Sequence, residues 1–243
     1  MQRLWWALSL CVLLASPASA GSPVTSAAGP VMPPCQYASE VCLRDDFMAG
    51  GYTTGIVGHL GWTIVNGTST GVSAESNRPG ILRRDTGSSI NTATSMYLRG
   101  LASVGTINPG QMFNTTWHIR LGQAVGTFDF RAGLGNSTIG DPPADGMYFE
   151  VLAADTNLYC VTRASSAQTR TDSGIAASTS WRALKIVRTA ASVQFFINGA
   201  PVCTHTTHAT AAMLQPMLFL ENTEAVAKTV DIDLFDFVGR VTR

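Results

Sequence analysis

The chain has 243 residues, and its 16 basic and 16 acidic side chains give a formal net charge of zero. Charged residues make up 13% of the chain and form no basic stripe, so it lacks the electrostatic footprint of a nucleic-acid-binding protein. No Lys-rich or amphipathic segment indicates binding to a membrane surface. The length suits one domain of β-sandwich size, and the sequence leaves the oligomeric state open.

Residues 1–20 have the pattern of a secretory signal peptide. Arg3 provides a basic start, residues 4–15 form an apolar run of about a dozen residues, and residues 16–20 end in a small-residue cleavage pattern. The apolar run is short for a membrane span, which makes a retained anchor the weaker alternative. We therefore predict a secreted or periplasmic protein that is cleaved after Ala20 and has no membrane-inserted segment afterwards. Residues 21–34, rich in Ala, Ser and Pro, are expected to form a flexible leader before a domain at 35–243.

Short runs with strand character follow one another along the rest of the chain, separated by Gly, Asn, Asp and Pro. They begin at Arg44–Phe47 and end at Val230–Val238, and no stretch has a long helical periodicity. The pattern predicts an all-β, antiparallel two-sheet sandwich whose first and last strands pair. The intervening strands are expected near residues 63–65, 80–84, 95–99, 112–121, 127–132, 147–152, 158–163, 181–189, 192–197, 201–205 and 217–221.

Alternation within these runs predicts which side chains are buried. In the run 112–121, Trp117 shares one face with two aliphatic residues, whereas His118 and Arg120 occupy the other face. We expect Trp62, Trp117, Trp181 and Tyr148 to be core residues, although each could instead stack on a sugar ring. The dipeptide Asn198-Gly199 predicts a tight hairpin turn.

Four cysteines remain after cleavage of the signal peptide, and an even number in an exported chain favours disulfides. Of the three possible pairings, we expect Cys35–Cys42 and Cys160–Cys203. The second would close a loop of over forty residues, which is worth roughly 4 kcal/mol of chain entropy. A zinc site is the alternative, but the sequence contains no closely spaced ligand pairs of the type C-x-x-C.

Several segments together resemble the concanavalin A-like lectin and glucanase jelly rolls, in the branch found among phage-like structural proteins and exported bacterial proteins. The resemblance covers most of residues 43–238. The matching segments are Asp45-Asp46-Phe47, Leu60-Gly61-Trp62, Asn77-Arg78-Pro79-Gly80-Ile81, Asp145-Gly146-Met147-Tyr148-Phe149-Glu150, residues 181–205 with Phe195-Phe196-Ile197-Asn198-Gly199 at their centre, and Asp231-Ile232-Asp233.

The resemblance implies a jelly-roll fold but allows several functions, which include sugar-binding lectins, glycoside hydrolases, polysaccharide lyases and non-catalytic adhesion or capsid modules. The catalytic Glu-x-Asp-x-Glu strand of the laminarinase-like members is missing. We therefore expect a non-catalytic, carbohydrate-binding or adhesion module. The alternatives are a divergent hydrolase or lyase and a structural component of a virion or surface assembly.

Candidate site residues follow from strand position. Glu150 and, less strongly, Glu221 are the candidates for an acid/base pair, since glycoside hydrolysis needs two nearby carboxylates. For sugar binding, the candidates are His118, Arg120, Glu150 and Arg163 on one outward-facing surface. Members of the resembled superfamily often hold a structural calcium near the chain ends, and hard cations prefer several oxygen ligands. No other cofactor is expected, and the candidate ligands of such a calcium are Asp45, Asp46, Asp231 and Asp233.

Overall fold

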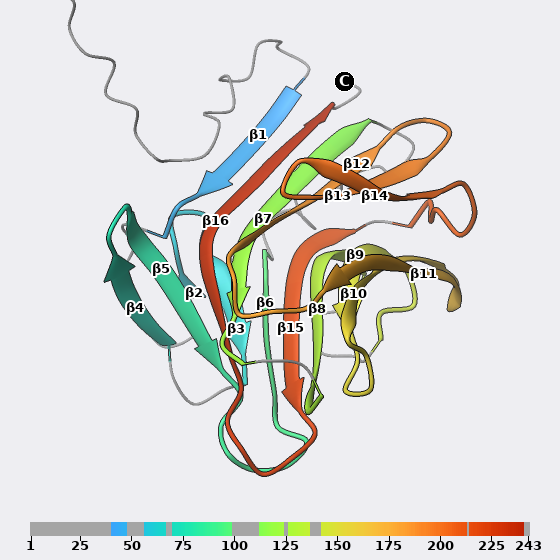
Figure 1. Ribbon diagram of the computed structural model, residues 1–243. Coiled ribbons are helices and arrows are strands. Elements are labelled where there is room, and N and C mark those ends of the chain that lie inside the picture. The colour runs from blue at the N-terminus through green and yellow to red at the C-terminus, as the bar shows by residue number, and fades with distance from the viewer. Residues whose placement is uncertain are drawn as a thin grey trace, which may run out of the picture.

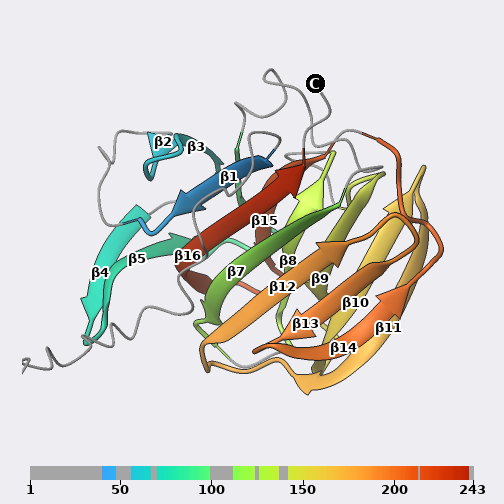
Figure 2. The ribbon, with the colours of Figure 1, turned by 90° about the horizontal axis from the view of Figure 1, so that it is seen from above.

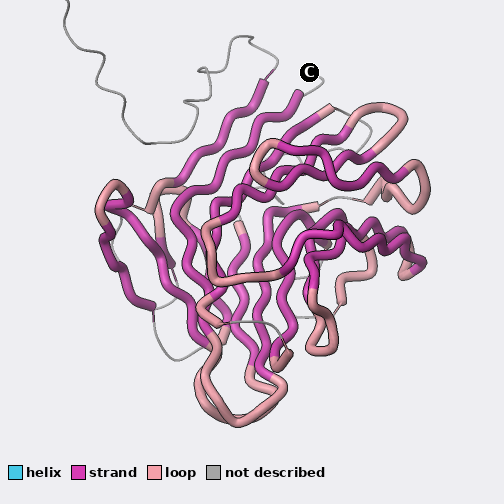
Figure 3. The backbone as a smooth tube through the Cα atoms, in the orientation of Figure 1, coloured by secondary structure: helices cyan, strands magenta, loops and turns pink. Residues whose placement is uncertain are grey.

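The computed structural model describes residues 40–47, 56–66, 70–98, 112–123, 126–136, 142–212 and 214–240. Within these ranges the chain forms strands, turns and loops only (Figure 3). The predicted signal peptide and leader lie outside the described residues. The described part also contains no helix that is long and apolar enough to cross a membrane.

The strands form two stacked antiparallel sheets (Figures 1 and 2), which confirms the predicted sandwich. Sheet A has the order β14-β13-β12-β7-β16-β5-β4, with β1 also paired to β16, and sheet B has the order β11-β10-β9-β8-β15-β6-β3-β2. The strands of sheet A are β1 (Glu40–Asp45), β4 (Thr70–Glu75), β5 (Arg78–Asp85), β7 (Phe113–Leu121), β12 (Arg182–Arg188), β13 (Val193–Ile197), β14 (Ala200–His205) and β16 (Thr229–Arg240). Those of sheet B are β2 (Ile56–Val57), β3 (Trp62–Val65), β6 (Ala93–Tyr97), β8 (Phe128–Gly135), β9 (Gly146–Val151), β10 (Asn157–Ala164), β11 (Ala167–Ala176) and β15 (Gln215–Asn222).

The first and last described strands pair, as predicted. β1 runs antiparallel to the second half of β16, with Asp45 opposite Phe235 and Glu40 opposite Arg240. β16 also pairs with β7 and, through its first half, with β5. The last described strand is therefore a central strand of sheet A, and the alternation of its apolar residues shifts by one position where its register with β7 shifts, between Ile232 and Leu234.

The core between the sheets centres on a group of large aromatic side chains. Trp62 comes from sheet B, whereas Trp117 and Phe235 come from neighbouring strands of sheet A, and all three are fully buried. The ring centroid of Trp62 lies 5.4 Å from that of Trp117 and 4.8 Å from that of Phe235. These edge-on and tilted contacts join the two sheets, and they confirm the core positions predicted for Trp62 and Trp117.

The disulfide Cys160–Cys203 is present and links β10 of sheet B to β14 of sheet A. Both cysteines are buried, so the bond lies between the layers rather than on the surface. Cys42 is also disulfide-bonded, and its predicted partner Cys35 lies outside the described residues.

The predicted Asn-Gly turn joins β13 to β14. Asn198 has a φ of 52° and Gly199 a φ of 84°, which is the left-handed pair that a tight type I′ hairpin requires. The hairpin β13–β14 forms the edge of sheet A and positions Cys203 opposite sheet B.

Candidate functional site

The four predicted sugar-binding residues lie on two different surfaces. His118 and Arg120 belong to β7 and face outward from sheet A, whereas Glu150 on β9 and Arg163 on β10 face outward from sheet B. The core lies between these two surfaces, so the structure does not bring the four side chains together. The expectation of one shared surface was wrong because alternation within a strand gives its two faces but not the sheet to which the strand belongs.

The outer face of sheet B is filled by large side chains. The strand register places Phe219, Arg131 and Glu150 in one row across β15, β8 and β9, with Tyr97, Met217, Tyr148 and Val161 in the next row. Although these side chains point away from the core, each is at most 7% exposed. Tyr97, Tyr148, Val161 and Met217 form a second apolar cluster, separate from the core between the sheets. The central part of this face is therefore packed rather than open.

Glu150 is held by two arginines within this surface. Its Oε1 accepts a hydrogen bond from Arg131 Nε at 2.8 Å, and its Oε2 accepts one from Arg170 Nε at 2.6 Å. The side chains of Glu150 and Arg131 are each 4% exposed. Arg170 also forms an ion pair with Asp155. Both oxygens of the candidate acid/base are thus committed to charged donors within the protein.

Aromatic rings flank the same ion pairs. The Arg170 guanidinium lies 3.5 Å from the ring centroid of Tyr159, and that of Arg131 lies 5.3 Å from the ring centroid of Phe219. Burial raises the pKa of Tyr148 to about 12, and the neighbouring Glu150 carboxylate acts in the same direction. Tyr148 is therefore a neutral phenol at physiological pH.

Glu221, the second candidate carboxylate, does not face Glu150. Its neighbours across β15 are Asp129 on β8 and Ala93 on β6. Glu150 lies two strands away and two residues further along, which separates the two Cα atoms by roughly 12 Å. Asp129 is the carboxylate directly opposite Glu221, and the sequence pattern alone did not indicate this pair.

A network of charged side chains crosses the outer face of sheet A around Arg120. Arg120 donates to Asp231 and forms an ion pair with Glu75 at 2.6 Å, while Arg83 pairs with the other oxygen of Asp231 at 2.6 Å. Burial opposes ionisation of Asp231, but hydrogen bonds from the two arginines outweigh it and lower the pKa of this carboxyl. Arg120 is therefore part of a neutralised network.

Trp181 covers this network instead of lying in the core, which corrects its predicted position. Its indole Nε1 donates to Glu75 at 3.3 Å, and its ring centroid lies 4.4 Å from the guanidinium of Arg78 and 4.8 Å from that of Arg120. Trp181 precedes β12 at a position that faces outward from sheet A, and it is partly exposed.

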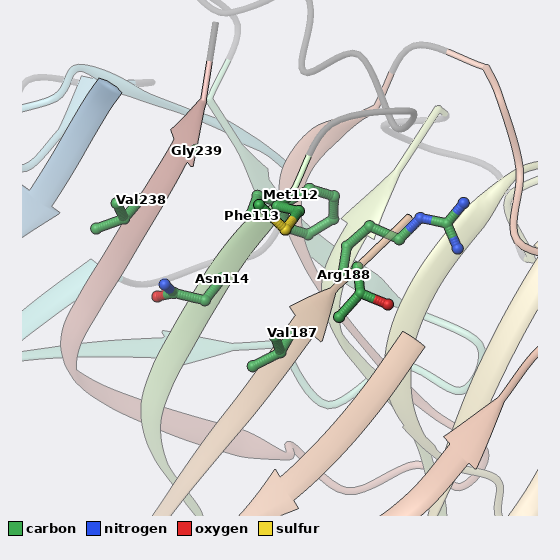
Figure 4. Close-up of a pocket in the computed structure, with 8 residues that line it drawn as sticks. Met112, Phe113, Asn114, Val187, Arg188, Val238 and Gly239 are labelled. Carbon is green, nitrogen blue, oxygen red and sulfur yellow. The ribbon is translucent and has the colours of Figure 1, made fainter. Parts of the chain in front are cut away.

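A hollow of about 230 Å³ lies at the far end of the same outer face, where β7, β12 and β16 run side by side. Asn114, Val187 and Val238 occupy one row across these strands, and Figure 4 shows the three side chains projecting to the same side of the sheet. The remaining lining residues are Met112, Phe113, Arg188, Thr189 and Gly239.

The four predicted calcium ligands do not converge on one point, and two of them form ion pairs with arginines. Asp231 pairs with Arg83 and Arg120, Asp233 pairs with Arg78, and Asp46 follows the end of β1. Within the described residues, no group of three or more acidic, His or Cys side chains is arranged to hold a metal ion. The four aspartates therefore do not form the expected cluster.

Asp45 instead organises the loop before β3. It accepts hydrogen bonds from the backbone N–H groups of Phe47 and Leu60 and from the indole Nε1 of Trp62, at 2.9 to 3.0 Å. Gly58 has a φ of 72°, and a Cβ placed there would lie 2.3 Å from Asp45 Oδ2. This buried carboxylate thus fixes a turn and the central tryptophan of the core.

The fold is similar to those of several solved carbohydrate-active proteins, at identities that show the fold alone. A Bacillus licheniformis β-glucanase has a TM-score of 0.53 at 17% identity, over 83% of this chain and 98% of its own. A native glycosidic hydrolase has a TM-score of 0.56 at 10% identity, over 81% of this chain and 95% of its own. The concanavalin A-like jelly roll predicted from the sequence is therefore confirmed.

A botulinum neurotoxin type C structure, described for its interaction with two ganglioside molecules, has a TM-score of 0.51 at 9% identity. The match covers 74% of this chain but only 43% of the neurotoxin chain. The comparison with curated protein sequences gave no match.

One family of sequences matches the region that contains most of both sheets. The match runs over residues 77–234, from the start of β5 into β16, and covers well over half of the chain. The chain therefore belongs to the family described as SO2946-like, C-terminal domain.

Proposed function

We propose that this protein is an exported, non-catalytic jelly-roll module that binds carbohydrate, as an adhesion or recognition domain. The observation that carries this proposal is the state of Glu150, whose two carboxylate oxygens are engaged by Arg131 and Arg170 in a buried surface. A general acid must offer a proton to the glycosidic oxygen, and a nucleophile must reach the anomeric carbon. A buried and doubly paired carboxylate does neither.

The fold and the disulfide support the remaining parts of the proposal. Jelly-roll proteins of similar fold include glycoside hydrolases and a neurotoxin that interacts with gangliosides, so the architecture is suited to glycan surfaces. The bond Cys160–Cys203 fits an oxidising compartment outside the cytoplasm, which agrees with the secretory pattern of residues 1–20.

The test combines binding and turnover on the same samples. The full chain is expressed with its N-terminal segment, and cell fractions are examined for a product cleaved after Ala20. The exported protein is then incubated with a panel of polysaccharides, and we expect retention in affinity electrophoresis without release of reducing ends. Turnover that is lost in Glu150→Gln would show instead that the protein is an enzyme acting through this residue.

A divergent glycoside hydrolase is the second candidate, and one observation favours it. Asp129 and Glu221 are direct cross-strand neighbours on the outer face of sheet B, which is the arrangement that brings two carboxylates close together. In that case, reducing-end release would survive Glu150→Gln and disappear in Glu221→Gln. The absence of turnover on every polysaccharide that binds would count against this candidate.

A further inference from the structure

The centre of the outer face of sheet B is filled around Glu150, so a glycan needs a more accessible surface. The outer face of sheet A is partly accessible along its central strands. Along β7 and β12, the outward-facing residues Asn114, Thr116, His118, Lys185 and Val187 are all partly exposed. This face also contains the hollow shown in Figure 4.

The hollow combines aliphatic walls with the side-chain amide of Asn114. Val187 and Val238 lie on either side of Asn114, and their methyl groups offer an apolar surface to the C–H groups of a sugar ring. The Oδ1 atom of Asn114 is shielded from solvent and accepts no hydrogen bond from the residues that the structure describes. A half-turn about χ2 exchanges Oδ1 and Nδ2, so either end of the amide can meet a ligand hydroxyl.

On this face, the ammonium group of Lys185 has no carboxylate partner among the described residues. Four acidic side chains of this sheet have arginine partners, which are Arg120 for Glu75, Arg83 and Arg120 for Asp231, Arg78 for Asp233, and Arg44 for Asp236. In contrast, no carboxylate of the described residues lies within ion-pair distance of Lys185. Lys185 is the cross-strand neighbour of Thr116 and lies two residues from Val187 on the same face, about 7 Å along β12.

From these positions we infer that the hollow and Lys185 together bind a carboxylated sugar residue of an acidic glycan, which rests on the carbohydrate-binding function proposed above. The ring lies against Val187 and Val238, and its hydroxyls bond to Asn114 and Thr116. The carboxylate pairs with Lys185, whose long stem spans the distance from the strand to the edge of the hollow. Because the neighbouring acids are already neutralised, they do not repel this carboxylate.

The experiment measures the affinity of the full chain for carboxylated glycans and for their neutral counterparts. The probes are polygalacturonate, polymannuronate and a sialylated glycoprotein, with carboxyl-reduced or desialylated forms of each. We expect the wild-type protein to bind at least one carboxylated probe and to bind its neutral form about tenfold more weakly or worse, since a charge-assisted hydrogen bond is lost.

Two variants test the site itself, and a matched variant controls for general charge effects. Lys185→Gln is expected to lower the affinity for the carboxylated probe about tenfold and to leave the neutral form unchanged. Val187→Trp fills the hollow and is expected to abolish binding. Arg163→Gln removes a partly exposed cation from the opposite sheet, where it bonds only to neutral groups in the described structure, and is expected to bind as wild type. Each variant is compared at an unchanged Tm.

The possible failures separate the inference from the function that it extends. Wild-type affinity in Lys185→Gln, or an equal loss in Arg163→Gln, would overturn the site while the protein remains a glycan binder. Equal affinity for carboxylated and neutral probes would overturn the acidic specificity alone. If no glycan in this set or in the polysaccharide panel binds, both the inference and the proposed function are wrong.

Discussion

Replacing Glu150 by Gln is the most direct way to distinguish a structural from a catalytic carboxylate. In the structure, the side chains of Glu150 and Arg131 are each only 4% exposed, and Arg131 donates to Oε1 at 2.8 Å. The amide of Gln would leave the buried Arg131 guanidinium without its carboxylate and would turn an NH₂ group toward one of the arginine donors. Removing one partner of a buried ion pair costs about 3 kcal/mol or more.

The free energy of unfolding from urea denaturation, monitored by tryptophan fluorescence, measures this loss. The matched control is Asp155→Asn, which removes the other carboxylate near Arg170 but leaves that arginine paired with Glu150, and it is expected to cost only about 1 kcal/mol. A loss below about 0.5 kcal/mol in Glu150→Gln, together with wild-type m values, would refute the description of this carboxylate as a buried structural anion.

Three further predictions concern stability. The double variant Cys160→Ala/Cys203→Ala should lose roughly 4 kcal/mol in urea denaturation, because the bond closes a loop with a sequence separation of 43; a loss under about 1 kcal/mol would contradict this. Gly58→Ala should lower stability by about 1–3 kcal/mol, since the new Cβ meets Asp45 in a left-handed backbone position, and an unchanged Tm would count against it. Burial raises the pKa of Asp236, so its ionised form destabilises the folded state above that pKa and has no such effect below about pH 4. Asp236→Asn should therefore have a higher Tm than wild type at pH 7 and an equal Tm in acid, and an equal Tm at both pH values would refute the reasoning.

Local chemistry explains why so much of the fold could be predicted from the sequence. Asn198-Gly199 adopts left-handed backbone angles that few other dipeptides tolerate, so it specified its hairpin wherever the strands were placed. The alternation in β7 identified Trp117 as a core residue, because one face of that strand is apolar and the other polar.

The strand β11 was missed, and its composition gives the reason. It is an edge strand with mostly exposed side chains, and its sequence of Thr, Ser, Gln, Asp and Gly lacks the apolar alternation by which strands are recognised. Its place in sheet B depends on hydrogen bonds to β10, which no local pattern encodes. Arg170, the partner of Glu150, lies on this strand and was missed with it. Arg131 could have been suspected only as a charged residue within the otherwise apolar run of β8.

The sequence by itself determined the all-β class, the Asn198-Gly199 turn and the core positions of Trp62 and Trp117, because each depends on residue type and periodicity. The expected disulfide Cys160–Cys203 and the pairing of the end strands were predictions that the structure confirmed. Only the tertiary structure decided that Glu150 is a paired, buried anion and that Trp181 lies on an outer surface. It also decided that the core separates His118 and Arg120 from Arg163. A strand's alternation defines its two faces, but the sheet that receives the strand, and the neighbours it gains there, follow from long-range pairing. In this chain, that pairing packed the surface around Glu150 and left the outer face of sheet A partly accessible.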